Sequence, residues 1–288
     1  MKKITIRAPA KLNLNLHIFS KKKSTDYFPV KFINCQIDLS DEIILEKQKN
    51  KIEVFSDAKD VPLDEENLCF RAAHLLKEKV RNNELGVKIF IRKKIPVKSG
   101  LGGGSADGAQ TLKGLLRLWN LKLAPKDILK IALNLGTDVC YCLIGGICEV
   151  GGIGEKVRKL NITIPKIPII VVTPKEKKPS TAWAYENLDV KRIGKNSYKA
   201  EKLPAAIKVK NINEIAKNLH NDFEYSIPKA YPMVNSIKKE LLKSGALKAM
   251  LCGSGLSVFG IYQNKILARK AFNKLKGRFK KVILAQTL

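Results

Sequence analysis

The sequence predicts a protein of the α+β class with two domains. Its 288 residues are enough for one large domain or two of ordinary size, each with its own core. Strand-like stretches with alternating apolar residues and helix-like stretches with apolar residues three or four apart occur in both halves. Residues near 155–166 form the expected junction. We therefore expect domains at 1–158 and 159–288.

The first half opens with a near-continuous apolar run that predicts a strand pair or one long bent strand at 3–19. A polar stretch that contains proline predicts a loop at 21–31. Further strands are expected at 32–47, 51–55 and 87–97, helices at 66–80, 106–121 and 124–136, and a hairpin with a glycine turn at 141–152. The helix at 124–136 has Pro125 near its start and Gly136 at its end, the usual asymmetry of helix termini.

The second half continues with the same mixture of patterns. A buried strand that leads into a proline-bounded loop is expected at 164–176. Helical patterns follow, including those at 234–244 and 266–279, and strands are expected at 246–262 and 280–286. No internal repeat is visible, so the chain is not a solenoid or propeller.

The charge of the chain is strongly positive, with 54 basic and 26 acidic residues and a formal net charge of +28. A nucleic-acid-binding module, for RNA in particular, is therefore the non-enzymatic alternative. The lysines are scattered along the chain and are not interleaved with aromatic residues, as a single-strand-binding platform would require. This distribution favours a solvated lysine-rich surface, whose field would help to gather a multiply charged small substrate.

The sequence shows no run of eighteen apolar residues and no signal-peptide pattern, so we expect a cytoplasmic protein without a membrane partner. Six cysteines are present, but no two form a CxxC pair. The three histidines do not have the spacing of zinc ligands. We therefore expect reduced and mostly buried thiols.

The stretch SGLGGGSADGAQTL at 99–112 contains five glycines, four of which directly precede a helical pattern while Gly108 lies within it. Glycine is needed where backbone N–H groups must approach an anion closely or where φ is positive. A helix that starts immediately afterwards turns its unsatisfied N–H groups and its dipole towards the same anion. The combination predicts a phosphate-binding loop, in which Ser105 is able to cap the helix or to reach a phosphate or Mg²⁺ with its hydroxyl.

Two common phosphate-binding patterns do not fit this loop. A Walker A motif requires a lysine after the last glycine, and none follows here. The dinucleotide pattern GxGxxG also fails in register, because Ser105 follows where a glycine is required. If this loop binds phosphate, it must therefore belong to a third kind of phosphate-binding motif.

Three segments of the chain resemble the three motifs of the GHMP small-molecule kinases, in the order in which that family has them. They are APAKLNLNLHI at 8–18, PVKSGLGGGSADGA at 96–109 and MLCGSGLSVFGIY at 250–262. The resemblance implies an N-terminal domain with a ribosomal-S5-like βαβ unit and a ferredoxin-like C-terminal domain. It also implies ATP as phosphoryl donor, Mg²⁺ as cofactor and a small-molecule alcohol as acceptor.

The resemblance also assigns residues to the donor half of the reaction. Asp138 matches the catalytic aspartate of the family, and Lys11, a lysine within an apolar strand, would lie close to it and to the transferring phosphoryl group. From the residues alone, a lysine there is either a surface charge on an edge strand or a buried cation with a carboxylate or phosphate partner, and the resemblance favours the second. The expected ATP-binding residues are Gly100, Leu101, Gly102, Gly103, Gly104, Ser105, Asp107 and Asn67. Asn67 precedes a predicted helix and is also suited to a capping role.

The residues expected to bind the acceptor substrate depart from the family pattern at one position. Segments such as ENLCFRAAHLL, LGTDVCYCLIGG, STAWAY and NDFE resemble family members that phosphorylate a cytidine diphosphate-linked sugar alcohol. The expected substrate-binding residues are Asn13, Tyr27, Phe28, Thr181 and Tyr185. Those members carry Gly-Tyr-His where this chain has Asp26, Tyr27 and Phe28. Tyr27 is able to stack on a base, but Phe28 lacks the hydrogen-bonding atoms of histidine.

Two enzymatic alternatives therefore stay open at the level of the sequence. One is a kinase for the cytidine-linked sugar alcohol, and the other is a GHMP kinase for another small alcohol or phosphate. For both we expect a monomer or weak homodimer.

Overall fold

The computed structural model describes residues 2–21 and 27–288, which form two compact units. The first unit comprises Met1–Lys11, Leu39–Val97 and Gly102–Gly145, and the second comprises Leu12–Asp38, Lys98–Leu101 and Gly146–Leu288. Both units mix helices and strands, which confirms the α+β class. The division at residues 158 and 159 stays a prediction. Asp26 lies outside the described residues.

The first unit is built around a sheet with a βαβ connection. Strands β1 (Lys3–Ile18) and β2 (Val30–Lys49) are long and contribute residues to both units. In this unit, β3 (Ile52–Ser56) and β4 (Leu85–Arg92) pair in parallel and are joined by helix α1 (Leu68–Val80). Strand β4 also pairs antiparallel with β2. The helix-linked parallel pair is the βαβ unit that the family resemblance implied.

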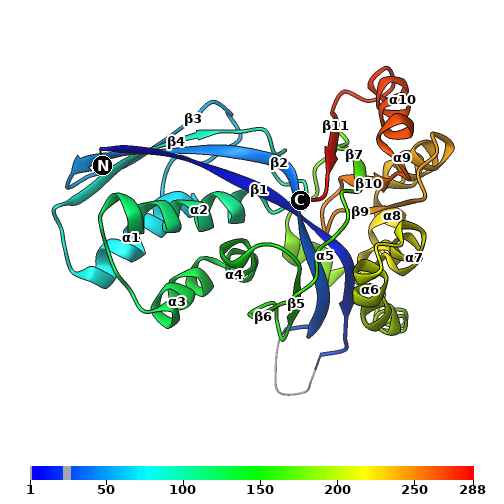
Figure 1. Ribbon diagram of the computed structural model, residues 1–288, viewed down its shortest axis with the longest axis horizontal. Helices are drawn as coiled ribbons and strands as arrows, with labels where there is room; N and C mark the ends of the chain where they lie inside the picture. Colours follow the sequence, from blue (N-terminus) through cyan, green and yellow to red (C-terminus); the bar gives the residue numbers. More distant parts are fainter. Residues whose placement is uncertain (1, 22–26) are drawn as a thin grey trace. The chain divides into compact units, whose positions relative to one another are not determined.

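Four helices cover one face of this sheet (Figure 1). After α1 come α2 (Gly103–Leu118), α3 (Pro125–Leu135) and α4 (Thr137–Ile144). Helix α2 approaches the strands closely, because a Cβ on its Gly114 would lie 2.4 Å from Ile6 and 2.5 Å from Leu45. Packing at this distance fixes the axis of α2, and with it the position of the glycine loop at its N-terminus.

Residues 141–152 differ from the predicted hairpin. Residues 141–144 form the last turn of α4, and only Cys148–Gly151 is a strand, β5. The apolar run was compatible with either structure, and Tyr141 is buried on the helix. Packing of α4 against α2 and α3 in this unit therefore outweighed the local strand pattern. Strand β5 pairs with β2 and with β6 (Lys156–Lys159) in the second unit.

The second unit contains a four-stranded antiparallel sheet in the order β11–β7–β10–β9. Its strands are β7 (Pro168–Val172), β9 (Lys248–Leu251), β10 (Val258–Ile261) and β11 (Val282–Gln286). Helix α9 (Met233–Lys243) precedes β9, and α10 (Lys265–Lys276) joins β10 to β11. This strand order and helix placement correspond to the ferredoxin-like arrangement that was expected.

The segment 246–262 forms two strands and not the single predicted strand. Its centre turns at Gly253, whose φ of +56° is left-handed, and the Cys252 N–H donates to the Ser257 carbonyl across the turn. The remaining elements of the second unit are α5 (Thr181–Glu186), α6 (Tyr198–Lys208), α7 (Ile212–Asn218), β8 (His220–Asn221), η1 (Asp222–Tyr225) and α8 (Ile227–Ala230). Strand β8 pairs in parallel with β1, with Asn15 opposite His220.

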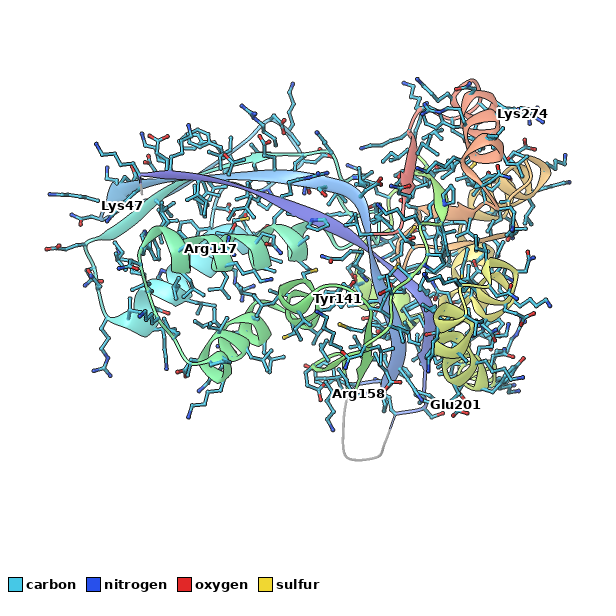
Figure 2. All side chains as sticks on the ribbon, viewed as in Figure 1. Lys47, Arg117, Tyr141, Arg158, Glu201 and Lys274 are labelled. Carbon is cyan, nitrogen blue, oxygen red and sulfur yellow. The ribbon has the colours of Figure 1, made fainter. Side chains whose placement is uncertain are left out.

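Basic side chains point into solvent from both units. Figure 2 labels exposed examples on several elements, among them Lys47, Arg117 and Lys274. This distribution agrees with a solvated lysine-rich surface. All six cysteines are buried, as the sequence predicted. Among the described residues, no helix is both long and apolar enough to cross a membrane.

Candidate functional site

The glycine loop leads directly into helix α2 of the first unit. Gly102 is the N-cap, with a left-handed φ of +68°. A Cβ at this position would lie 2.8 Å from Cγ of Lys11, so glycine also makes room for the lysine. No side chain among the described residues caps α2, and its first turn carries no acidic residue. The N–H groups at the start of α2 are therefore suited to an anion.

The glycines of this loop differ in how much space surrounds them. In the second unit, a Cβ on Gly100 would lie 1.8 Å from the Cys252 carbonyl oxygen, and φ of Gly100 is +83°. A Cβ on Gly255 would lie 2.5 Å from the Ser99 carbonyl oxygen, so the glycine-containing third motif packs directly on the loop backbone. In the first unit, Gly104 is exposed, and a Cβ there would meet no described atom within 4 Å. Packing requires Gly100, whereas Gly104 leaves open space for a ligand.

Lys11 and Asp138 form an ion pair in the first unit. Nζ of Lys11 lies 3.2 Å from Oδ2 of Asp138, and their side chains are 6% and 38% exposed. Lys11 is held in the strand β1, and Asp138 lies in the first turn of α4, where the helix dipole favours a negative charge. The sequence predicted both residues, and the structure brings them together. A lysine beside a half-exposed carboxylate is suited to neutralising a phosphoryl group while the carboxylate orients a hydroxyl.

A second buried ion cluster lies beneath the start of α2. Nζ of Lys93 donates to Asp41 and to Oδ2 of Asp107, the latter at 2.7 Å. Asp41 also accepts from the backbone N–H groups of Lys94 and Ile95. Sequence reasoning missed this Lys93 cluster, because Lys93 stands in a basic run after the end of β4 and Asp41 is 52 residues away along the chain. We use the name Lys93 cluster for Asp41, Lys93 and Asp107.

The electrostatics of the Lys93 cluster are set by burial. Burial and the neighbouring Asp41 raise the pKa of Asp107 to about 7, although Lys93 opposes the shift. Burial disfavours the ammonium of Lys93, but Asp107 and Asp41 raise its pKa above the ordinary value. Nζ of Lys93 is also 3.3 Å from the position that a Cβ of Gly103 would occupy. The cluster therefore holds the segment in which the phosphate loop becomes a helix.

Two of the predicted ATP-binding residues have structural partners. Asp107 is buried and bonds to Lys93, as described above. Asn67 caps α1: its Oδ1 accepts from the Cys69 N–H at 2.8 Å, and its Nδ2 donates to the Pro62 carbonyl at 2.6 Å. Leu101 is buried and Ser105 is half-buried in the first turn of α2. Contact of these residues with a nucleotide stays a prediction.

The predicted acceptor-binding residues of the second unit fall into an aromatic group and a polar group. Phe28 stacks on Tyr185, with ring centroids 5.8 Å apart and planes 21° apart. Tyr185 also contacts Phe223 edge-on, and Nζ of Lys21 lies 4.9 Å from the centre of the Phe28 ring. Tyr27 and Thr181 are exposed. Phe28 thus belongs to an aromatic cluster that is suited to holding the face of a planar ring.

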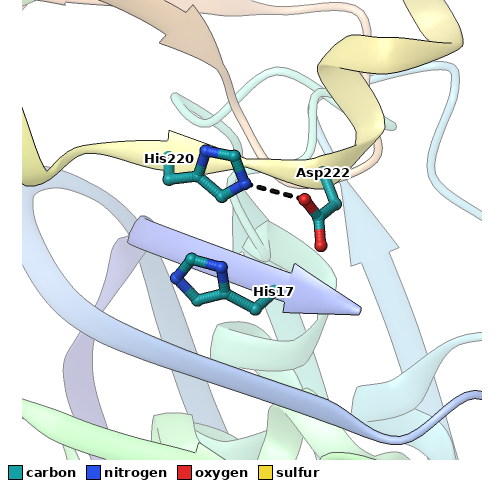
Figure 3. Close-up of side chains that lie close together, drawn as sticks. All are labelled: His17, His220 and Asp222. Atoms are coloured by element: carbon teal, nitrogen blue, oxygen red, sulfur yellow. Dashed lines mark hydrogen bonds and ion pairs between the residues drawn. The ribbon is translucent and has the colours of Figure 1, made fainter. Parts of the chain in front are cut away.

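The polar group begins at Asn13, which is buried on β1. Its Nδ2 donates to Oδ1 of Asn34 on β2 at 2.7 Å. Further along β1, His17 stacks on His220 of β8, with ring centroids 4.7 Å apart and planes 13° apart (Figure 3). Nε2 of His220 donates to Asp222 at 2.7 Å. The sequence did not predict that Asn13 contacts Asn34 or that His17 contacts His220, because these residues come from elements that are far apart along the chain.

His17, His220 and Asp222 are also the one group among the described residues whose donor atoms are close enough to suggest a metal site. The ring geometry argues against it. An ion bound to imidazole lies near the plane of the ring, about 2.0–2.1 Å from the nitrogen. Two nearly parallel stacked rings have no such point in common. Asp222 is moreover occupied by His220 and by the backbone N–H groups of Ile18 and Gly194.

A glycine loop at the uncapped start of a helix, together with a lysine–aspartate pair, is the arrangement expected of a small-molecule kinase, and the family comparison agrees. The model of the GHMP kinases N terminal domain matches residues 67–146, and that of the GHMP kinases C terminal domain matches residues 203–281. The chain belongs to the GHMP kinase family, whose members use ATP as phosphoryl donor.

Relatives at higher similarity cover the whole chain. Two proteins named 4-diphosphocytidyl-2-C-methyl-D-erythritol kinase are similar to it. The protein from Acetivibrio thermocellus is 39% identical over 100% of both chains. The protein from Thermoanaerobacter pseudethanolicus is 40% identical over 100% of this chain and 97% of its own.

Solved structures show the same fold. A crystal structure of 4-(cytidine 5'-diphospho)-2C-methyl-D-erythritol kinase matches with a TM-score of 0.82 and 25% identity, over 99% of both chains. A homoserine kinase from Cytophaga hutchinsonii matches with a TM-score of 0.77 and 22% identity, over 100% of this chain and 95% of its own. The kinase assignment replaces the RNA-binding alternative.

Proposed function

We propose that this chain transfers the γ-phosphoryl group of ATP to the 2-hydroxyl of 4-diphosphocytidyl-2-C-methyl-D-erythritol. The products are the 2-phosphate and ADP, and the reaction belongs to isoprenoid precursor biosynthesis. The observation that carries the chemistry is the Lys11–Asp138 pair, in the same unit as the uncapped start of α2. The choice of acceptor is supported by full-length similarity to proteins that bear this substrate in their names.

The donor half of the reaction uses the glycine loop. Backbone N–H groups of Gly102–Ser105 bind the phosphates of ATP, and the open space beside Gly104 admits them. Lys11 neutralises charge on the transferring group. Mg²⁺ bound with the phosphates supplies further charge neutralisation, and the hydroxyl of Ser105 is an oxygen ligand of the kind that this ion prefers.

Asp138 acts on the acceptor hydroxyl. Its carboxylate accepts the hydroxyl proton and orients the oxygen for in-line attack on phosphorus. Its partner Lys11 fixes the carboxylate by the 3.2 Å contact. In a loose transition state the proton leaves late, so orientation of the hydroxyl matters as much as basicity.

The acceptor half is assigned to the second unit. Asn13 orients the sugar alcohol, while Tyr27, Phe28, Thr181 and Tyr185 enclose the cytidine end. The stacked pair of Phe28 and Tyr185 supports this assignment, because aromatic faces bind a planar base without regard to its hydrogen-bonding edge.

A second candidate function is a GHMP kinase reaction on another small alcohol or phosphate. The observation that favours it is Phe28 itself, which offers no hydrogen-bonding atom to a cytosine. A substrate panel with ADP release as readout decides between the two. Turnover of the cytidine substrate supports the first function. Its failure, together with turnover of a mevalonate-type or amino-alcohol substrate, supports the second.

A further inference from the structure

A row of buried polar side chains extends from Asn13 along β1. Asn13, Asn15 and His17 occupy alternate positions of the strand and therefore share one face. Asn34 joins them from β2 through its hydrogen bond to Asn13. All four side chains lie in the second unit and are at most 1% exposed. We call these four residues the polar row.

Among the described residues, six buried side-chain polar atoms have no hydrogen-bond partner, and four of them belong to the polar row; the other two are Oδ1 of Asp107 and Oγ1 of Thr111. No described residue hydrogen-bonds to Nδ2 of Asn15, to Nδ2 of Asn34 or to either ring nitrogen of His17. Native proteins pair nearly all such atoms, because an unpaired buried donor or acceptor is costly. These atoms are covered by protein in the structure, so a ligand reaches them only when neighbouring side chains move aside. Their concentration on one face of adjacent strands points to a bound molecule as the missing partner.

The ring of His17 is held firmly although its nitrogens are unpaired. It stacks on His220, which is anchored by its hydrogen bond to Oδ1 of Asp222. Oδ2 of Asp222 accepts from the N–H groups of Ile18 and Gly194, at 2.7 and 2.9 Å. The scaffold thus fixes the imidazole without using its hydrogen-bonding atoms, as a preorganised recognition group requires.

The surroundings keep this imidazole neutral. Burial and the neighbouring His220 lower the pKa of His17 to about 4; Asp222 opposes the shift, and Lys31 and Lys199 reinforce it. A neutral imidazole offers one N–H donor and one bare nitrogen acceptor. It is therefore complementary to a neutral polar group such as the amino–imino edge of a pyrimidine or a hydroxyl.

The position of His17 along the strand indicates which end of the acceptor it meets. Four residues of a strand span about 13 Å, so His17 lies well beyond Asn13, to which we assign the sugar alcohol. The acceptor of the proposed reaction carries its sugar alcohol and its base at opposite ends of a diphosphate. The far end of the polar row therefore corresponds to the nucleoside.

We propose that His17 is a specificity-determining residue that hydrogen-bonds the nucleoside end of the acceptor, with the amide of Asn15 beside it. This inference rests on the proposed function and deepens it. It also assigns a hydrogen-bonding side chain to an acceptor site whose aromatic members, Phe28 and Tyr185, supply stacking.

The decisive variant is His17→Phe, which keeps a planar ring on His220 and removes both nitrogens. We expect the KM for the cytidine acceptor to rise about tenfold, because the variant loses one hydrogen bond to a buried group. The KM for ATP and kcat should change less than about twofold, since the donor half is untouched. His17→Gln, which restores a donor and an acceptor, should recover part of the affinity. An unchanged KM for the acceptor in His17→Phe would overturn the proposal and show that the row is structural or holds water only.

A direct measurement covers the case in which His17→Phe does not fold. CDP is added to the wild-type protein labelled with ¹⁵N in its histidines, and the ring nitrogen signals are followed by NMR. A shift of the His17 signals supports the proposal, and signals that stay in place at saturating CDP contradict it. Zn²⁺ serves as a separate probe: a rise in Tm of the wild type that is absent in His17→Phe would show a metal site and overturn the proposal.

Failure of this inference is distinguishable from failure of the proposed function. If the wild type does not turn over the cytidine acceptor, the proposed function is wrong whatever His17 does. If the wild type turns it over and His17→Phe has the same KM, the function stands and the role of His17 is refuted.

Discussion

Two buried polar groups of this protein satisfy their atoms in different ways. The Lys93 cluster of the first unit is held mainly by its own ion pairs, since Lys93 bonds both carboxylates and Asp41 also accepts from two backbone N–H groups; only Oδ1 of Asp107 has no described partner. The polar row of the second unit is uncharged and keeps several atoms without a described partner. The comparison separates a group that is held largely by its own ion pairs from a group that, in our proposal, a ligand completes.

The difference also has a physical reason in the proposed chemistry. A loop that binds and releases a polyanion must keep its shape in both states, and a charge-compensated cluster beneath it does so without the ligand. Recognition of a neutral group, in contrast, gains selectivity from buried atoms that only the correct ligand satisfies. Four predictions test this comparison, and they are ordered by the size of the expected effect.

The largest effect is expected for Asp138→Asn, which acts on chemistry and on neither polar group. Loss of the carboxylate should lower kcat by about 10²–10⁴-fold, the usual contribution of a positioned base. The KM for the acceptor should stay near that of the wild type, in contrast to His17→Phe. Steady-state kinetics with circular dichroism as a folding control measure both. Asp127→Asn, at an exposed pair with Lys79, is the matched control, and turnover of Asp138→Asn close to this control would remove Asp138 from the mechanism.

The second effect is on stability, and it distinguishes the two groups directly. Lys93→Met leaves the buried carboxylates Asp41 and Asp107 without their cation, and should reduce the free energy of unfolding by about 3–5 kcal/mol. His17→Phe, which removes unpaired atoms, should leave it unchanged or raise it. Urea denaturation measures both variants, with Lys79→Met at the surface pair as control, for which about 0–1 kcal/mol is expected. An equal loss of unfolding free energy in Lys93→Met and His17→Phe would contradict the claim that only the Lys93 cluster supports the fold.

The third prediction compares two glycines of one loop. Gly100→Ala should cost about 1–3 kcal/mol, because its Cβ would collide with the Cys252 carbonyl and its φ is positive. Gly104→Ala should leave stability unchanged or raise it by less than about 1 kcal/mol, since its Cβ meets open space within a helix. That space is the proposed phosphate site, so the KM for ATP should rise in Gly104→Ala. A Gly104→Ala enzyme with the wild-type KM for ATP would place the phosphates elsewhere.

The smallest net effect is expected in the pH dependence of the wild-type stability, because the two groups contribute slopes of opposite sign that largely offset each other. The pKa of Asp107 is raised on folding from 3.8 to about 7, so the folded state holds its proton more tightly and this contribution falls as pH rises from about 4 to 7. The pKa of His17 is lowered from 6.5 to about 4, so the unfolded state takes up the proton first. Its contribution to stability is therefore present above pH 6.5 and is lost as pH falls towards 4.

These opposite slopes are separable by substitution. The free energy of unfolding is measured between pH 4 and 7 and plotted against pH. Compared with the wild type, the slope of this plot should be more positive for Asp107→Asn and more negative for His17→Phe. The same change of slope in both variants would contradict the assignment of opposite shifts.

The sequence by itself determined the local features of this protein. Alternation along β1 separates an apolar face from one that carries Lys11, Asn13, Asn15 and His17, because strand residues point alternately to opposite faces. The glycine run before a helical pattern predicted a phosphate loop, and the three motifs led to the family. These signals are readable because each depends on residues that are close together along the chain.

Tertiary structure alone decided which of these residues meet. The Lys93–Asp41 contact joins residues 52 positions apart, and the Ile18–Asp222 hydrogen bond joins residues 204 apart. No local periodicity encodes such pairs. Residues 141–144 became helical for the same reason: an apolar run is compatible with strand or helix, and burial of Tyr141 on α4 decided between them. The sequence thus supplied the chemical groups, and long-range packing determined which were paired and which were left for a ligand.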